Sequence, residues 1–492
     1  MADLWRPLVS QYLEPFGSDG GITLADVDRA EQWAANATAF SATGSFRAQI
    51  IDGALYVKMI RVHQHWAERT SVLRMLLLAC CSPSSAKGPK HVDFVYGHAD
   101  NDPTPAPRSC RWPDGRPRER RRGRPCIPTR RLPLFTNSHD RRSGGLPVPE
   151  FTWVGWGSAE PWCRQQKQFD EAARTTSWAA RDRRLYFSGG LDNGHHRKAL
   201  RALALGERSA GRHDELHIRD VGSNFHRWSQ YDRVQPKATL QKILGNATTA
   251  VATQRWGKRR EQALTLMTEQ IGQTRVGPVA ATHACGYQYA INVPGFGYSS
   301  RLRSLLRCGN AVVHVHHPSA EFFMPLLKHG EHLFIISGRE PVRDALLPLL
   351  RSLHADPTRA GQVAAAGRRF ASTYLSFDAV IGYLGALLNG YAEMRTRGDA
   401  HDAASARPPP TPSELLAQGY THVATDDDLQ RLSGMCDRCK DSGARSRPPP
   451  GCVVRPRLPA CTLWAPRGGG RCFDTRCCKG FDCATTPLGC ST

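Results

Sequence analysis

Apolar and polar positions alternate along the chain in blocks that predict strands and helices following one another. Short apolar runs, which are typical of buried strands, occupy residues 92–96, 184–188, 287–293, 311–315 and 333–336. Apolar residues recur at helical spacing in residues 195–205, 300–307, 322–327, 341–353, 361–374 and 377–395. Strands that alternate with helices in this way predict parallel sheets flanked by helices, so the expected fold class is α/β.

Compositional breaks divide this pattern. Residues 102–131 are rich in Pro, Arg and Gly without apolar periodicity, which predicts a solvated, disordered insertion. Residues 396–435 run through Ala-rich and Pro-rich patches, which predict a linker. The chain is therefore expected to contain an N-terminal half (20–180), a second half with closing helices (181–395), the linker, and a Cys-rich module (436–492).

The net charge of +22 raises the possibility of an anionic partner. Between Arg108 and Arg131, ten Arg face only Asp114 and Glu119, so this segment alone contributes 10 − 2 = +8. It contains almost no aromatic residue for base stacking, with only Trp112, which argues against nucleic acid as the partner. The moderate remaining excess suits an enzyme whose substrate carries phosphates.

The cysteines concentrate at the C-terminal end, where nine of the sixteen lie in residues 436–492. This density predicts a disulfide framework and an oxidising compartment. Six of the nine, with the adjacent pair Cys477-Cys478 at their centre, resemble the cystine-knot mini-protein pattern. The alternative is a zinc site that uses Cys436 and Cys439 with later cysteines.

Two sequons, at Asn36 and Asn246, agree with passage through the secretory pathway. The expected location is therefore the ER or Golgi lumen or the outside of the cell, although residues 1–24 show no signal peptide. The longest apolar run, residues 75–81, is far below the roughly 18 residues that a membrane span needs.

The segment 289–303 carries the strongest candidate chemistry. A predicted strand ends at Val293, and Gly295 and Gly297 permit a tight turn with close backbone approach. Ser299 or Ser300 is expected to cap the next helix, which would place Arg301 and Arg303 in its first turn. Cations at that end are favourable when an anion such as a diphosphate is bound there. The alternative is a solvent-facing arginine on an ordinary helix.

Two other chemistries fit this region less well. The dinucleotide fingerprint is incomplete, because Ser300 stands where its third glycine belongs, which disfavours a nicotinamide enzyme. The following strand carries His314 and His316 on one face, but no carboxylate or cysteine accompanies them at useful spacing. The sequence therefore predicts no metal site.

Several motifs occur together in a recognisable order. The most specific are 289–293 with Gly295, Ser299 and Arg301, then 309–313, then Glu321-Phe-Phe-Met-Pro-Leu-Leu-Lys328. Weaker ones lie at 52–56, 93–96, 147–156, 178–190 with Arg197, 370–375 and 383–391. Over most of residues 20–395 this order resembles glycosyltransferase family 90, the capsule-associated and protein O-glucosyltransferase-like group.

The resemblance implies a GT-B fold, in which two Rossmann-like domains face a cleft, and inverting transfer from a UDP-sugar without a metal cofactor. UDP-glucose and UDP-xylose are the donors it suggests, with a protein or glycan hydroxyl as acceptor. Carried over residue by residue, Ser299 and Arg301 beside Gly295 hold the diphosphate, and Arg197 assists. Glu321 bonds donor hydroxyls, and Thr152, Trp153 and Gly157 line the donor and acceptor cleft.

An inverting transferase needs a base that takes the proton of the acceptor hydroxyl. The resemblance places this base shortly after the strand 93–96, where Asp100 fits by distance from the strand and Asp102 by adjacency to Pro103. Asp100 is preferred, and a turn built by the two side chains is the alternative for both.

The chain departs from the family pattern at Ser188, where the family has an arginine, and Arg197 is reached only by a one-residue shift. Two alternatives therefore stand beside the transferase: an exostosin-like polysaccharide transferase, and a non-catalytic secreted glycan-binding protein that retains the fold.

Overall fold

The computed structural model describes residues 2–36, 44–61, 66–80, 89, 91–99, 104, 130–140, 145–154, 161–191, 194–209, 215–220, 280–339, 341–403, 406–424 and 428. These residues form two compact units, each with its own sheet. Unit 1 combines Met1–Gln165, Pro318–Leu326 and Thr373–Thr492, and unit 2 combines Gln166–His317 and Leu327–Ser372. The predicted Cys-rich module at 436–492 and most of the insertion at 102–131 lie outside the described residues.

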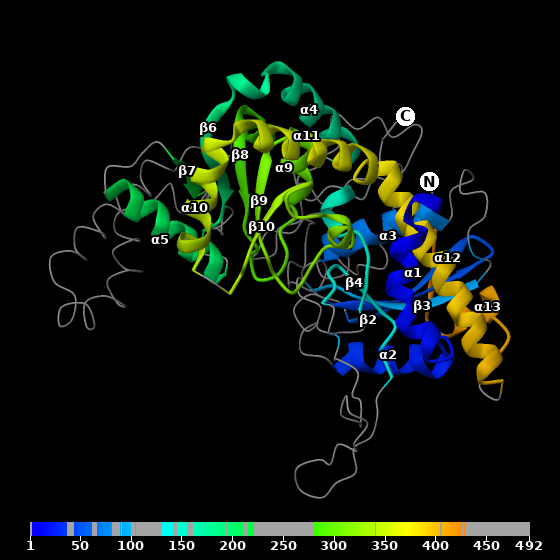
Figure 1. Cartoon of the computed structure of the whole chain (residues 1–492). Helices are drawn as coiled ribbons and strands as arrows, with labels where there is room; N and C mark the ends of the chain where they lie inside the picture. The colour runs from blue at the N-terminus through cyan, green and yellow to red at the C-terminus, as the bar shows by residue number, and fades with distance from the viewer. Residues whose placement is uncertain are drawn as a thin grey trace, which may run out of the picture. The chain divides into compact units, whose positions relative to one another are not determined.

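Unit 2 contains a five-stranded sheet in which all neighbouring strands are parallel, as the alternating pattern predicted. Its strands, in the order in which they lie side by side, are β10 (Phe334–Ile336), β9 (Ala311–Val315), β8 (Tyr287–Asn292), β6 (Asp182–Gly189) and β7 (Leu216–Asp220). Figure 1 shows these strands side by side beneath α11. The predicted strands of this half are all present, whereas β7 was not predicted.

The order of these strands creates a switch point between β6 and β8. From β6 the chain passes to β7 on one side, and it later continues through β8, β9 and β10 on the other. The connections that leave the carboxyl ends of β6 and β8 therefore run in opposite directions. In open parallel sheets, ligands bind at the carboxyl ends of the strands next to such a switch point.

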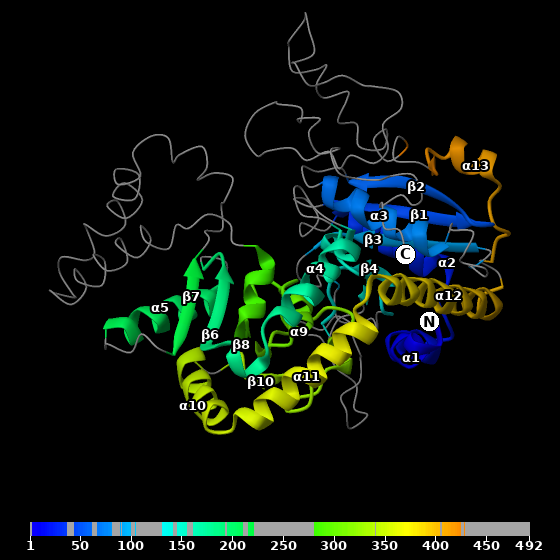
Figure 2. The same ribbon diagram turned by 90° about the horizontal axis from the view of Figure 1, so that it is seen from above.

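Helices cover the apolar residues of this sheet. One continuous core joins the strands to α5 (His195–Ser209), α10 (Val342–Ala355) and α11 (Pro357–Tyr374). Figure 2 shows α10 and α11 along one side of the strands. The short helix α9 (Leu302–Cys308) packs against the 3-10 helix η4 (Ala281–Gly286), and the Cys285–Cys308 disulfide joins the two.

Unit 1 contains a mixed sheet, unlike the all-parallel sheet of unit 2. Its strands, in spatial order, are β11 (Thr421–Val423), β2 (Ala54–Arg61), β1 (Ser45–Ile51), β3 (His91–Gly97), β4 (Leu134–Thr136) and β5 (Leu146–Pro147). Strand β1 is antiparallel to both of its neighbours. The cause is local, because Asp52 (φ 47°) and Gly53 (φ 81°) form a two-residue hairpin turn that returns the chain beside β1.

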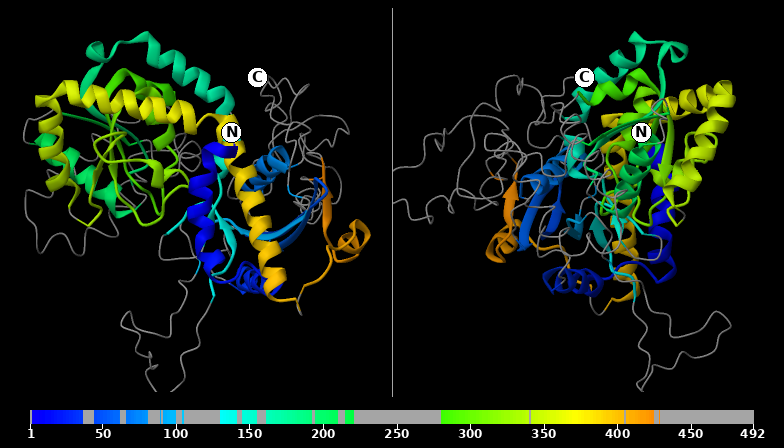
Figure 3. Two further views of the ribbon diagram at one scale, coloured as in Figure 1. Left: turned by 45° about the vertical axis from the view of Figure 1, so that its right-hand side comes forward. Right: turned by 90° about the vertical axis from the view of Figure 1, so that its left-hand side faces the viewer.

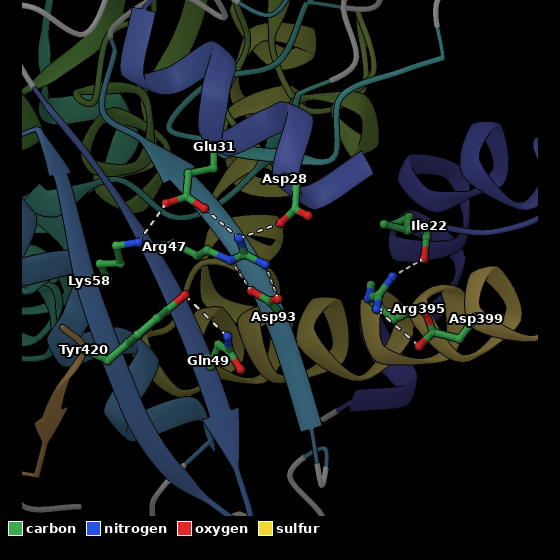
Figure 4. Close-up of polar contacts among 10 residues, drawn as sticks. All are labelled: Ile22, Asp28, Glu31, Arg47, Gln49, Lys58, Asp93, Arg395, Asp399 and Tyr420. Atoms are coloured by element: carbon green, nitrogen blue, oxygen red, sulfur yellow. Dashed lines mark hydrogen bonds and ion pairs between the residues drawn. The ribbon is translucent and has the colours of Figure 1, made fainter. Parts of the chain in front are cut away.

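A buried arginine fastens a helix to this sheet (Figure 4). Arg47 on β1 donates to both carboxylate oxygens of Asp93 on β3, over 2.8 and 2.5 Å. It also donates to Asp28 and Glu31 on α2 (Leu24–Asn36). Burial opposes its charge, but the hydrogen bond and attraction of Asp93 outweigh that cost and raise the pKa of Arg47. Because all four of these residues belong to unit 1, the network serves the fold of that unit.

Long helices complete unit 1. Helix α1 (Ala2–Ser18) lies alongside α12 (Phe377–His401), as Figure 3 shows, and α12 also contacts α3 (Trp66–Cys80). The fully buried Trp5 donates its indole N–H to the carbonyl of Ala379 over 2.7 Å. No single described helix is both long and apolar enough to cross a membrane, and α11 and α12 pass that test only as a bent pair.

The segment expected to be a linker contains ordered elements. Helix α13 (Pro412–Ala417) begins with a capping box formed by Thr411 and Glu414. Strand β11 then pairs with β2, and Leu415 and Tyr420 pack on Tyr56 of that strand. The Pro-rich composition favoured a linker and so concealed this docking. Pro412 is compatible with the helix because it stands at its start, where proline is well tolerated.

Candidate functional site

The candidate site lies at the carboxyl ends of β6 and β8 in unit 2. The loops that follow these strands touch through their backbones. A Cβ at Gly194, where φ is +86°, would stand 2.4 Å from the carbonyl oxygen of Gly295. Only glycine adopts this φ readily and has no side chain to clash with the Gly295 carbonyl, so Gly194 allows the two loops to touch. A Cβ at Gly189, the last residue of β6, would stand 1.9 Å from Nη1 of Arg301.

Two arginines from different elements converge on this point. Arg197 on α5 donates through Nε to the carbonyl of Val293 over 3.4 Å, and through Nη1 to that of Gly190 over 3.2 Å. Arg301 donates through Nη2 to the same Val293 carbonyl over 3.3 Å, and through Nη1 to that of Ser188 over 2.8 Å. The structure thus brings together two of the predicted binding residues, one from each side of the switch point.

The surroundings of these arginines disfavour their charge. Burial lowers the pKa of Arg301 to about 9, and the neighbouring charge of Arg197 lowers it as well. Burial lowers the pKa of Arg197 to about 10. Within the described residues neither guanidinium forms an ion pair with a carboxylate, and Nε of Arg301 is buried without a hydrogen-bond partner. The guanidinium of Arg301 lies 4.4 Å from the ring centre of Phe187, which gives it a cation–π contact.

This arrangement favours an anionic ligand. Two neighbouring cations repel each other, and taking a charge out of water costs several kcal/mol per ion. A folded protein keeps such a pair when an anion compensates it, and guanidinium groups match phosphate oxygens with two parallel hydrogen bonds.

The helix that follows differs from the sequence-based expectation. Helix α9 begins at Leu302, its N-cap residue is Arg301, and no side chain caps it. The serine cap was therefore wrong, since both serines precede the N-cap residue and Ser300 lies in a turn. Ser299, which lies two residues before Arg301 in the sequence, is buried. Its hydroxyl makes no hydrogen bond within the described part of the chain. Arg303 is also buried, and the second cation of the site is Arg197 instead.

The loop between Val293 and Ser299 exposes one large apolar side chain. Gly295 lies against Arg197, since a Cβ there would be 3.3 Å from Nη2. Phe296 follows it with 67% of its surface exposed. A side chain at Gly295 would therefore crowd the guanidinium of Arg197, whereas the predicted approach of this backbone to a ligand stays a prediction.

Histidines lie at the same edge of the sheet. His314 on β9 is buried, and its Nδ1 lies 2.9 Å from Nδ2 of Asn292 at the end of β8. Burial lowers the pKa of His314 to about 3 and that of His196, on α5, to about 4. No group of three His, Cys, Asp or Glu in the described ranges is arranged to hold a metal ion. Asn292 was not among the predicted site residues, because spacing along the sequence does not show which residue of the neighbouring strand lies beside it.

Other predicted site residues belong to unit 1. Glu321 is buried in the segment 318–326, where the side-chain hydroxyl of Tyr12 donates to the carbonyl of Phe322 over 2.7 Å. Thr152 donates its N–H to Glu150 over 2.9 Å. Trp153 is fully buried against Trp162 and Phe322, which places it in the core of unit 1, and its predicted part in the cleft stays a prediction. Gly157 lies outside the described residues.

The candidate bases Asp100 and Asp102 also lie outside the described residues, and the chain just before them is well packed. His98 is buried, and its Nδ1 lies 3.1 Å from both Tyr96 Oη and Asn137 Nδ2. Tyr96 in turn donates to Asn137 over 2.7 Å. This polar cluster fixes the end of β3 from which the segment with both aspartates departs.

Comparison with known proteins gives a family match. The model of glycosyl transferase family 90 matches residues 112–403, which are 292 of the 492 residues. No curated protein matches the chain. Among solved structures, the chain is similar to Anabaena HepE, described in complex with UDP-glucose, with 16% identity and a TM-score of 0.19. That match covers 27% of this chain and 36% of HepE, so it spans about a third of that protein.

Proposed function

The chain belongs to glycosyl transferase family 90, and from this premise we propose that it transfers glucose or xylose from a UDP-sugar to a hydroxyl of a protein or glycan. In this proposal the sugar inverts its anomeric configuration. The transferase has a GT-B fold, with unit 2 as its donor-binding half.

The observation that carries the proposal is the convergence of Arg197 and Arg301 on the Val293 carbonyl. Both cations lack a carboxylate partner among the residues that the structure describes, and both lie at the switch point of a parallel sheet. A diphosphate there would neutralise the pair and satisfy Nε of Arg301. The Ser299 hydroxyl and the backbone around Gly295 are proposed as further donors to it.

The chemistry follows from this placement. The acceptor oxygen attacks the anomeric carbon while the bond from that carbon to the β-phosphate oxygen breaks, and its electron pair stays on UDP. The two guanidinium groups stabilise the charge that develops on the departing diphosphate. The carboxylate of Asp100, or of Asp102, takes the proton of the acceptor hydroxyl. Glu321 is proposed to bond hydroxyls of the donor sugar.

A lumenal or secreted location is part of the same proposal. The Cys285–Cys308 disulfide supports it, because disulfides persist in oxidising compartments. Cys163 is disulfide-bonded as well.

A donor screen tests the function. The purified full chain is incubated with UDP-glucose, UDP-xylose and other UDP-sugars, and release of UDP is measured with and without acceptor. We expect release with one or two donors, and loss of that release in Arg301→Met. A folded protein that releases no UDP from any donor, yet binds glycans, would instead favour the non-catalytic binding protein.

A further inference from the structure

A second polar pair lies beside the two arginines. Asn292 ends β8 and His314 lies on β9, and the two residues are partners across these parallel strands. Their side chains face each other, with Nδ2 of Asn292 2.9 Å from Nδ1 of His314. Asn292 is 1% exposed and His314 8% exposed, so both are fixed in the interior at the edge where the sheet ends.

The pair keeps unused hydrogen-bonding capacity. When Asn292 donates to Nδ1, the neutral imidazole carries its proton on Nε2, which is then a free donor. The other amide atom, Oδ1 of Asn292, is buried without a partner in the described chain. Exchanging the two amide atoms and moving the imidazole proton still leaves at least one donor and one acceptor. The pair therefore offers at least one of each, without net charge.

A buried acceptor without a partner is unfavourable, because it has lost its hydrogen bonds to water and gained none in return. If the pair had only a structural role, this oxygen would be expected to have a hydrogen-bond partner. Buried polar atoms in proteins almost always bond to another polar group or to an ordered water. The orphaned oxygen is thus an independent indication of a ligand at this point.

The position of the pair limits which part of a ligand it meets. Asn292 directly precedes Val293, whose carbonyl receives both guanidinium groups. If the diphosphate meets the two guanidinium groups, a ligand group that reaches Asn292 would be one that neighbours the diphosphate. In a nucleotide sugar, that group is either the ribose or the transferred sugar, and both carry neighbouring hydroxyls. One hydroxyl can donate to Oδ1 of Asn292, while the next accepts from Nε2 of His314.

We propose that Asn292 and His314 bind a vicinal diol of the donor nucleotide and thereby select sugars and nucleosides that carry it. This inference rests on the proposed function, because it places the diol next to the diphosphate held by Arg197 and Arg301.

Calorimetric titration of the full chain with UDP, 2′-deoxy-UDP and UDP-glucose tests the inference. The variants are His314→Phe and Asn292→Leu, with the exposed His422→Gln in unit 1 as the matched control, and thermal unfolding verifies that each is folded. If the diol is that of the ribose, we expect wild type and control to bind 2′-deoxy-UDP about tenfold more weakly than UDP. That difference should fall below twofold in both variants.

If the diol belongs to the transferred sugar, UDP should bind the variants as it binds wild type, whereas UDP-glucose should bind them about tenfold more weakly. Affinities for all three ligands within twofold of wild type in both folded variants would overturn the inference and leave the proposed function standing. Should His314→Phe fail to fold, His314→Gln replaces it, and the same criterion applies. Wild-type protein that binds neither UDP nor UDP-glucose contradicts the proposed function, and the inference falls with it.

Discussion

Arg197 and Arg301 donate hydrogen bonds to one carbonyl oxygen, that of Val293, over 3.4 and 3.3 Å. One arginine follows β6 and the other follows β8, so the contact joins the two sides of the switch point in unit 2. Burial lowers the pKa of both side chains below the ordinary 12.5. The free protein therefore holds two cations at a place where a bound anion would stabilise them better than water does.

The first prediction concerns the charge of Arg301. Arg301→Met keeps a long side chain but removes the cation, and we expect UDP-glucose affinity to fall about 100-fold, because truncating one partner of a buried charged pair costs about 2–5 kcal/mol. The thermal midpoint of the free protein should change little, since the cost of burying the charge disappears along with its hydrogen bonds.

Calorimetry and thermal unfolding measure both effects. Arg343→Met, at an exposed position on α10, is the matched control and should leave affinity and midpoint unchanged. Equal losses of affinity in the two variants would show that overall charge, and not the site, is responsible.

The second prediction uses two glycines. A Cβ at Gly189 would stand 1.9 Å from Nη1 of Arg301, so Gly189→Ala must displace that guanidinium. We expect at least a tenfold loss of UDP-glucose affinity in a protein that still unfolds cooperatively. In contrast, Gly206 on α5 has open space at its Cβ, and Gly206→Ala should stabilise the protein by about 0.5–1 kcal/mol without changing affinity. Unchanged affinity in Gly189→Ala would mean that Arg301 does not touch the donor.

The third prediction is the dependence of binding on pH. Because the pKa of Arg301 is about 9 and that of Arg197 about 10, both lose their protons in the free protein well before an exposed arginine does. The diphosphate favours the charged forms, so binding must take up protons once the pH passes these values. UDP-glucose affinity should be constant between pH 6.5 and 8 and decline several-fold by pH 10. Titrations in a series of buffers measure this, and a flat profile up to pH 10 would contradict the assignment.

The fourth prediction identifies the base. Asp100→Asn removes the proton acceptor but leaves unit 2 unchanged, so UDP-glucose should bind normally while transfer falls by at least 100-fold, the lower end of what general base catalysis contributes. Asp102→Asn is the paired variant, and it should retain transfer if Asp100 is the base. Loss of transfer in Asp102→Asn alone would assign the role of base to Asp102. Normal transfer in both variants would exclude both aspartates as the base. The readouts are calorimetry for binding and UDP release for turnover.

Local sequence pattern predicted much of unit 2. Strands β8, β9 and β10 are visible as short apolar runs, because β8 and β9 are buried along their whole length and β10 nearly so. Helices such as α10 are visible because one face of each is apolar and buried. The meeting of Arg197 with Arg301 was expected only through the family resemblance. It depends on β6 lying beside β8, and such pairing between distant strands leaves no mark in a local window.

Local sequence pattern predicted less of unit 1. The Asp52-Gly53 turn, a strong hairpin signal, was present in the sequence, yet the alternating pattern elsewhere favoured a parallel sheet. The docking of α13 and β11 was hidden by a Pro-rich composition that is typical of linkers. Trp153 matched a motif, but its role was decided by tertiary packing against Trp162.

The most direct test of the central claim is a crystal structure of the protein with UDP bound. We predict that the diphosphate lies at the carboxyl ends of β6 and β8, with its oxygens within hydrogen-bonding distance of Arg197 and Arg301. A diphosphate bound elsewhere, with both guanidinium groups still bonded only to backbone carbonyls, would contradict the account.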